Sequence, residues 1–389
     1  MSAGTSSPLL AVVHPPERSG LHTFWAARWE GLQEAGCSVY IAVPSDADFD
    51  GIPGIPDEYL RPIEMSRPRG TRELASNARH LLRVRREADR VSALANALGA
   101  RVVVTHGPHF LTGALAARRS EGLAHCLLVH SDMAPAVSAR VLRAVRSPDL
   151  AGYELPSTTR KFASVFAPPT KTFRIRPVLN CAPRPPTNDR GPNKIVVGFV
   201  AALSPRKRVD IFLGLVAELE RRRPGDFSFR VISVVAPAQR EWFEAEIEPV
   251  VKRLRSDGVD LAMIDGSGGA QAHMVEFDYL VVTSDHEGLP NVIMEGLAAG
   301  ATVVTRHLEG AVMFSELLQP AAADRYLVML APEEPRPELA LADLLEDAGA
   351  GRHHSDETAR EVFSPSLANS ELLENLRPFR FPAQSKDGH

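Results

Sequence analysis

Two glutamates, Glu287 and Glu295, bracket the stretch with the strongest chemical signal, which reads EGLPNVIMEGLAAG and ends at Gly300. The apolar run Tyr279–Val282 before it predicts a buried strand, followed by a polar loop and then a helix that begins near Pro290. No good side-chain cap precedes that helix, so its first backbone amides are candidates to bind an anion, phosphate above all. Carboxylates accept hydrogen bonds from sugar hydroxyls. The combination therefore suits a nucleotide sugar.

A second charged group, Arg206, Lys207 and Arg208, lies between a predicted strand at Lys194–Val200 and a predicted helix at Val209–Arg222. Cations at such a junction can hold a diphosphate and stabilise the charge that develops on a leaving group. A solvated basic turn is the alternative interpretation. This alternative is disfavoured because the junction and the loop that contains Glu287 are expected at the same edge of a parallel sheet.

The first half of the chain offers weaker candidates at its strand ends. His130 follows a predicted strand at His125–Val129, and His106 follows another at Arg101–Thr105. Gly20 lies in the first loop, where a glycine allows the backbone to approach a ligand closely. A lone histidine is more often structural, and most loop glycines only form turns. The only argument for a functional role of these residues is therefore their position at the strand ends.

We assign no metal site. Asp46-Ala47-Asp48 has the spacing of a motif that holds a divalent metal for a nucleotide diphosphate, but it lies in a loop-like stretch, Ser45–Pro62. The three cysteines, Cys37, Cys126 and Cys181, are far apart and match no metal spacing. In a mechanism without a metal, the positive charge would come from the protein, which the basic group after Val200 can supply.

The overall composition is that of an ordinary soluble protein. The 389 residues are 44% hydrophobic and 24% charged, and the net charge of −4 gives no support for nucleic-acid binding. The start of the chain lacks the features of a signal peptide, and no apolar run approaches the ~18–20 residues that cross a bilayer, so we expect a cytoplasmic protein. The basic stretch Arg79–Arg90 permits peripheral membrane contact, but Glu87 and Asp89 dilute its charge and make a solvated helix face the favoured interpretation.

Alternating strand and helix patterns predict a parallel α/β domain in each half of the chain. A proline-rich stretch, Cys181–Pro192, has the composition of a linker. We therefore predict domains at residues 1–183 and 193–363. The stretch Ala151–Phe173 is expected to be poor in helix. The predicted strands not yet named are Leu9–His14, Val39–Val43, Phe229–Val235, Leu261–Ile264 and Thr302–Val304, with Tyr326–Leu330 as one more candidate.

With these residues in hand, the chain resembles the family 4 retaining glycosyltransferases of the GT-B fold. The stretch from Glu287 to Gly300 is similar to the E-x7-E motif of that family and the small-residue helix that follows it. Val197–Asp210 is similar to the family's strand-loop-helix segment that ends in a Lys-x-Val-Asp pattern. Phe277-Asp278-Tyr279 and Val178-Leu179-Asn180 also fit. The resemblance is strong from about residue 194 to 312 and weak before that.

The resemblance implies two Rossmann-like α/β domains facing across a cleft, the first binding the acceptor and the second the nucleotide sugar. A C-terminal helix at about 364–389 would pack back onto the first domain. Glu287 would contact the donor sugar near the reacting carbon, Glu295 would bind the ribose and Lys207 the diphosphate. His130 would face the donor sugar from the other domain, and Gly20 would let the first loop reach the diphosphate. The segment that would hold sugar hydroxyls and phosphate consists of Gly288, Leu289, Pro290 and Asn291.

Three positions depart from the family pattern. The family usually has an arginine five residues before the lysine, where this chain has Ala202, so Arg206 or Arg208 is left to replace its charge. The first loop has a single glycine, Gly20, where two are common. The usual Gly-Gly turn after the motif is Glu309-Gly310 here.

The predicted reaction moves a sugar from a nucleotide diphosphate sugar to an acceptor hydroxyl with retention of configuration, without metal or cofactor. A UDP-sugar is favoured as the donor over a GDP-sugar, and the acceptor is a small molecule or a lipid-linked one. Two alternatives stay open. One is a GT-B-fold nucleotide-sugar epimerase or hydrolase, and the other is a degenerate module that only binds a sugar nucleotide.

Overall fold

The computed structural model describes residues 8–13, 20–45, 51–52, 54–65, 78–130, 147–163, 170–179, 194–318, 326–331, 334–347 and 356–380. The chain divides into two compact units. Unit 1 comprises Met1–Asn180 together with Ser364–His389, and unit 2 comprises Cys181–Phe363. The motif Asp46-Ala47-Asp48 and the stretch Cys181–Pro192 lie outside the described residues.

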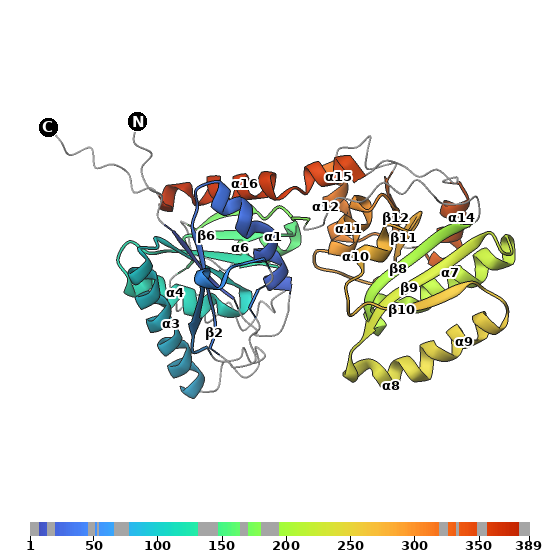
Figure 1. Ribbon diagram of the computed structural model, residues 1–389, viewed down its shortest axis with the longest axis horizontal. Coiled ribbons are helices and arrows are strands. Elements are labelled where there is room, and N and C mark those ends of the chain that lie inside the picture. Colours follow the sequence, from blue (N-terminus) through green and yellow to red (C-terminus); the bar gives the residue numbers. More distant parts are fainter. Residues whose placement is uncertain are drawn as a thin grey trace. The chain divides into compact units, whose positions relative to one another are not determined.

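Unit 1 is built on a seven-stranded parallel sheet in the order β3-β2-β1-β4-β5-β6-β7 (Figure 1). The order reverses between β1 and β4, and the carboxyl ends of such strands border the ligand crevice of open α/β sheets. The strands are β1 (Leu9–Val12), β2 (Val39–Pro44), β3 (Leu60–Ile63), β4 (Val102–His106), β5 (Ala124–Val129), β6 (Leu150–Tyr153) and β7 (Lys171–Arg174).

Helices pack on both faces of this sheet because its central strands are apolar on both sides. Leu9 of β1 packs in one cluster with Trp25 and Leu372, and the next residue, Leu10, packs in another cluster with Ala88. Helices α1 and α16 therefore cover one face, and α3 and α4 the other. The described helices of unit 1 are α1 (Gly20–Glu34), α3 (Ala78–Leu98), α4 (Phe110–Arg119), α6 (Pro156–Ala163) and α16 (Pro365–Arg380).

Two sequence-based assignments in unit 1 are wrong. The stretch Ser45–Pro62, expected to be a loop, contains most of β3. The stretch Ala151–Phe173, expected to be poor in helix, contains α6 and most of β6 and β7. These strands are only four residues long, and β7 at the sheet edge is largely exposed, so no long apolar run marks them.

Unit 2 is built on a six-stranded parallel sheet in the order β10-β9-β8-β11-β12-β13, which confirms the predicted α/β class. The strands are β8 (Ile195–Leu203), β9 (Phe227–Val235), β10 (Leu261–Asp265), β11 (Tyr279–Val282), β12 (Thr302–Thr305) and β13 (Leu327–Met329). The order reverses between β8 and β11. Strand β8 pairs with β9 along its whole length, but its register with β11 covers only Tyr279↔Val197 and Leu280↔Gly198. The two strands are thus no longer paired where their following loops begin.

Alternate residues of β11 face different helix layers. Tyr279 and Val281 pack in a cluster with Phe212 of α7 and Leu341 of α14, whereas Leu280 faces Gly296 of α11. Helix α11 in turn contacts α15.

The described α-helices of unit 2 are α7 (Val209–Arg222), α8 (Arg240–Trp242), α9 (Glu248–Ser256), α10 (Gln271–Met274), α11 (Asn291–Ala298), α12 (Glu309–Leu318), α14 (Pro337–Asp347) and α15 (Asp356–Val362).

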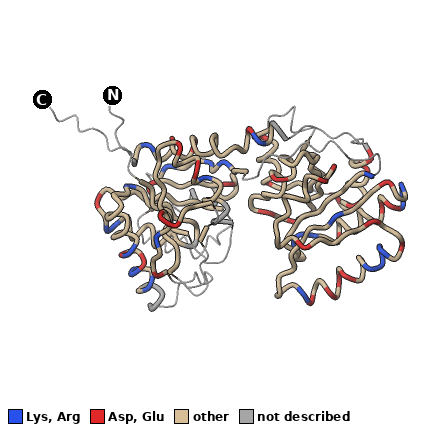
Figure 2. Tube along the Cα trace, in the orientation of Figure 1, with Lys and Arg blue, Asp and Glu red and all other residues tan. Residues whose placement is uncertain are grey.

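Positive and negative side chains are interspersed along both units (Figure 2). On the basic helix α3, Arg90 pairs with Glu64, and Asp89 pairs with Arg119 of α4 at 3.0 Å. Part of the charge of this helix is therefore neutralised locally. Within the described part of the chain, no helix is both long enough and apolar enough to cross a membrane.

Close packing of α11 on β11 leads to a first prediction. A Cβ added at Gly296 would lie 2.3 Å from Cδ2 of the buried Leu280. We expect Gly296→Ala to lower the free energy of unfolding by about 1–3 kcal/mol, because overpacking forces the neighbours to shift. Gly268→Ala is the matched control, since its Cβ would meet nothing within 4 Å. Urea unfolding followed by circular dichroism measures both, and equal stability of the two variants would contradict this account.

Candidate functional site

The candidate site lies where the loops after β8 and β11 meet, at the point where the strand order of unit 2 reverses. The loop after β8 contains a short 3-10 helix, Pro205–Lys207, and the loop after β11 leads from Thr283 to Pro290. Nζ of Lys207 contacts Oε1 of Glu287, which joins the two segments that the sequence singled out.

The ion pair between Lys207 and Glu287 is largely shielded from solvent. The Glu287 side chain is 9% exposed and that of Lys207 is 20% exposed. Nη1 of Arg206 lies 3.8 Å from the other carboxylate oxygen, Oε2, and the Arg206 side chain is 44% exposed. Two cations thus surround one carboxylate, which leaves an excess of positive charge at the carboxyl edge of β8.

Thr283 holds the backbone beside Lys207 in place. Its hydroxyl is fully buried and shares its one hydrogen between the carbonyl oxygens of Lys207 and Arg208, which lie 2.9 and 2.8 Å from Oγ1. The amide of Asp285 donates to the carbonyl oxygen of Arg206 at 3.0 Å. Arg208 has φ 52° and ψ 47°, the left-handed region that costs a non-glycine residue about 1–3 kcal/mol. These contacts from the loop after β11 stabilise that conformation.

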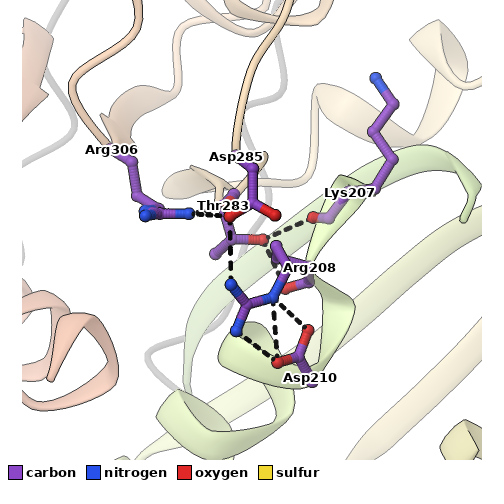
Figure 3. A network of polar contacts seen from close by, with 6 residues as sticks. All are labelled: Lys207, Arg208, Asp210, Thr283, Asp285 and Arg306. Atoms are coloured by element: carbon purple, nitrogen blue, oxygen red, sulfur yellow. Dashed lines mark hydrogen bonds and ion pairs between the residues drawn. The ribbon is translucent and has the colours of Figure 1, made fainter. Parts of the chain in front are cut away.

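The guanidinium of Arg208 belongs to a separate network (Figure 3). It donates to both carboxylate oxygens of Asp210 and, at 3.1 Å, to Oδ1 of Asp285, which also accepts a bond from Arg306 at 2.5 Å. The hydrogen bond to Asp210 raises the pKa of Arg208. Partial burial opposes ionisation of Asp285, but the bonds from Arg306 and Arg208 lower its pKa overall. In Figure 3 the Lys207 side chain extends away from this network.

A pocket of about 260 Å³ adjoins the ion pair. Lys207, Glu287 and Glu295 line it together with Asn291, and so does the apolar Val234 near the end of β9. Burial raises the pKa of Glu295, and a hydrogen bond from Gln271 offsets part of that shift. The pocket thus combines charged and aliphatic side chains, and a ligand with a phosphate group and an apolar ring would fit it. Ala202 also lines it.

Helix α11 begins at Asn291, one residue later than predicted, and Pro290 precedes it without a side-chain cap. Two amides of this turn are already bonded. Asn291 donates to the carbonyl oxygen of Leu289 at 3.0 Å and Ile293 to that of Pro290 at 2.9 Å. The amide of Asn291, predicted to hold the substrate, is therefore engaged within the loop. Gly300 lies just past the helix end with φ 86°, as its position in the sequence predicts.

The start of α12 supports the loop that precedes α11. A Cβ added at Gly310 would lie 2.3 Å from Cδ of Pro290 and 2.9 Å from the carbonyl oxygen of Gly288. From the sequence, Glu309-Gly310 is notable only because it stands where the family usually has a Gly-Gly turn. The structure shows these two residues at the start of a helix, where the missing side chain of Gly310 allows the loop to approach closely.

Unit 1 carries a second polar group at the carboxyl edge of its sheet. His106 ends β4, His130 follows β5 and Glu154 follows β6. Nδ1 of His106 lies 2.8 Å from Nε2 of His130, and Nδ1 of His130 lies 2.5 Å from Oε1 of Glu154. Trp25 lies on α1, the helix that begins at Gly20. Nε1 of Trp25 donates a hydrogen bond to Nε2 of His106 at 2.8 Å. Sequence reasoning singled out the two histidines and missed Trp25 and Glu154.

Comparison with known proteins agrees with this geometry. Residues 194–346 match the family model described as "Glycosyl transferases group 1". The second half of the chain is thus similar to the group 1 glycosyl transferases. None of the curated proteins matches it in sequence. The family match confirms that the protein is a glycosyltransferase.

Solved structures with the GT-B fold resemble this glycosyltransferase over nearly its whole length. A glycosyltransferase from Rickettsia africae has a TM-score of 0.73 at 15% identity, with 96% of this chain and 98% of that one covered. A sucrose-phosphate synthase from Thermosynechococcus elongatus has a TM-score of 0.68 at 16% identity, covering 95% and 98%. HepE from Anabaena, in complex with UDP-glucose, has a TM-score of 0.63 at 16% identity, covering 95% and 99%. At these identities the likeness establishes the fold alone.

The Thr283 contacts yield a second prediction for this glycosyltransferase. Thr283→Val removes a buried hydroxyl and leaves two carbonyl oxygens without it, so we expect a loss of about 1–3 kcal/mol in the free energy of unfolding. The backbone of Lys207 should shift as well, which weakens binding of a nucleotide sugar. Thr305→Val is the control, because its equally buried hydroxyl donates to the carbonyl oxygen of Arg306 at 3.0 Å. Calorimetry tests this, and unchanged nucleotide-sugar affinity in Thr283→Val alongside the control would argue against a positioning role.

The buried histidine of unit 1 yields a third prediction. Burial, then His130 and His109, lowers the pKa of His106 well below its ordinary value of about 6.5. The unfolded chain therefore binds a proton that the folded chain excludes, so this contribution to stability is present above pH ~6.5 and is lost as the pH falls below it. We expect the free energy of unfolding to fall by up to about 1.4 kcal/mol per pH unit in that range. Urea unfolding between about pH 7.5 and 5.5 measures the slope.

His106→Gln should flatten this pH dependence, because the variant has no group to titrate at that position. His307→Gln, an exposed residue of unit 2, is the control and should keep the wild-type slope. A steep acid dependence that persists in His106→Gln would assign the effect to other groups.

Proposed function

We propose that this glycosyltransferase transfers a sugar from a nucleotide diphosphate sugar to an acceptor hydroxyl with retention of configuration. The observation that supports the proposal most is the Lys207–Glu287 pair that lines the pocket in unit 2. A UDP-sugar is the favoured donor and a GDP-sugar the next candidate. The UDP-glucose complex of HepE, a protein with the same fold, supports a UDP-sugar.

Each pocket residue has a role suited to its chemistry in this proposal. The ammonium group of Lys207 balances the negative charge that grows on the diphosphate as the sugar bond breaks. Glu287 accepts hydrogen bonds from the donor sugar, and Glu295, farther along α11, accepts them from the ribose. The protein then acts by positioning and charge stabilisation, and no side chain needs to attack the sugar. Cations of the chain supply the charge, so the reaction needs no metal.

Arg206 is the better candidate to replace the arginine that family members have at the position of Ala202. Its side chain is 44% exposed and its nearest carboxylate oxygen, on Glu287, is 3.8 Å away. The guanidinium of Arg208, in contrast, makes hydrogen bonds to Asp210 and Asp285 and would have to give them up. We therefore propose that Arg206 binds the diphosphate and that Arg208 serves to hold the loop.

A fourth prediction separates these roles. Lys207→Ala and Arg206→Ala should each weaken UDP-glucose binding by about 10- to 100-fold, because a hydrogen bond to a charged group contributes about 1.5–3 kcal/mol. Glu287→Ala should remove most transfer while the protein stays folded. Lys252→Ala, which removes an exposed lysine paired with Glu248 on α9, is the matched control. Isothermal titration and a transfer assay with a chelator present measure binding and turnover.

The alternatives predict different results in the same experiments. Rapid release of free or epimerised sugar from the donor without any acceptor would favour a hydrolase or epimerase. Binding without turnover across a broad acceptor panel would favour a module that only binds. Wild-type activity in Lys207→Ala or Glu287→Ala would exclude this site as the centre of the reaction.

A further inference from the structure

Four side chains at the carboxyl edge of unit 1 form one line of hydrogen bonds, from Trp25 through His106 and His130 to Glu154. They come from four different parts of the unit: α1, the end of β4, and the residues after β5 and β6. The two imidazole rings lie 28° from parallel, with ring centroids 4.9 Å apart. Their nearest nitrogens are 2.8 Å apart, so the rings meet at their edges.

The first member of this line fixes the direction of all the others. An indole N–H can only donate, so Nε2 of His106 must accept and carries no proton. The proton of the neutral His106 ring is then on Nδ1, and it is donated to Nε2 of His130. Nε2 of His130 carries no proton either, which leaves the proton of that ring on Nδ1, facing Oε1 of Glu154. One arrangement of protons satisfies every contact.

We propose that Trp25, His106 and Glu154 are positioning residues that hold His130 as a neutral ring, with its proton on Nδ1 and its Nε2 lone pair occupied. A second proton on His130 would make its contact with Glu154 an ion pair. Here a second proton on Nε2 would face the N–H of His106. It could enter only if the bond from His106 or the bond from Trp25 broke.

The surroundings of the pair agree with a neutral state. His106 is fully buried, His109 lies close enough to disfavour a positive charge on it, and its pKa is lowered. The ring of Phe24 lies 4.8 Å from that of His130. Arg28 of α1 lies over the Phe24 ring at 4.3 Å and interacts electrostatically with Glu154 and Glu371. Glu154 is thus shared between a neutral histidine and a buried arginine.

The consequence for the reaction rests on the proposed function together with the family resemblance, which implies that His130 would face the donor sugar. A ring with both nitrogens engaged can neither take a proton from the acceptor nor give one to the leaving group. His130 would therefore act as a fixed neutral ring, and the proton of the acceptor would leave by another path. The proton positions themselves can be measured without any donor, so this proposal and the proposed function can fail independently.

The test is nuclear magnetic resonance of the full chain labelled with ¹⁵N at histidine, at a pH of about 6.5, near the ordinary histidine pKa. Nitrogen shifts distinguish a ring protonated on Nδ1, on Nε2 or on both, and His106→Gln and His130→Gln identify the signals. In the wild-type protein both rings should be neutral with the proton on Nδ1. A proton on Nε2 of either ring would overturn the proposal.

Trp25→Phe removes the donor that sets the direction, so Nδ1 of His106 becomes able to accept. His130 should then carry protons on both nitrogens and pair with Glu154, and Glu154→Gln on the same background should return it to the neutral state. Trp29→Phe is the matched control, because this tryptophan of the same helix donates to the carbonyl oxygen of Val39 instead. If His130 has the same signals in Trp25→Phe as in the wild type, Trp25 does not set its state. Should Trp25→Phe fail to fold, the tautomers of the wild-type rings decide the question.

Discussion

The bonds from the Thr283 hydroxyl to the carbonyl oxygens of Lys207 and Arg208 are the contacts on which the rest of the unit 2 site depends. Strand β8 ends in a turn that needs a left-handed residue, and the sequence supplies an arginine there where a glycine would avoid strain. The buried hydroxyl holds that turn from the neighbouring strand. As a result, two consecutive cations are separated: Arg208 joins the carboxylate network that Figure 3 shows, and Lys207 reaches Glu287.

Sheet geometry explains why the ligand pocket forms at this place. Strand β8 is paired with β11 only at its beginning, whereas its pairing with β9 continues to Leu203. The carboxyl-terminal residues of β8 therefore line a space between the two loops, and the walls of that space combine backbone, aliphatic and charged groups. Unit 1 uses the corresponding edge of its own sheet differently. It holds the buried His106 and the partly buried His130 there in a line of hydrogen bonds that ends at Glu154, although the topology of the two sheets is similar.

Sequence reasoning succeeded where a pattern is local and fails where it depends on distant partners. The apolar run of Tyr279–Val282 and the glycine at position 300 are local signals, and they located β11 and the end of α11. The short strands β3 and β7 have too few buried residues to produce such a signal. Trp25 and His106 are 81 positions apart, and only the fold shows that the indole sets the tautomer of the ring. The different environments of Arg206 and Arg208 likewise depend on Asp210 and Asp285, which pair with Arg208. No rule of sequence spacing predicts these pairs.

The two glutamates of the motif line the same pocket but occupy different electrostatic environments. Glu287 contacts an ammonium group, and this contact reduces the freedom of a lysine side chain whose rotamers would otherwise cost about 2 kcal/mol to order. A diphosphate that displaces the carboxylate from Lys207 therefore meets a cation already in place. Glu295 is in a different setting, where burial raises its pKa and a hydrogen bond from the side-chain amide of Gln271 opposes the rise. A neutral hydroxyl is a better partner for a carboxylate in that setting than a charged group, because its approach adds no further desolvated charge. Two residues of one type, eight positions apart, are thus suited to different parts of one ligand.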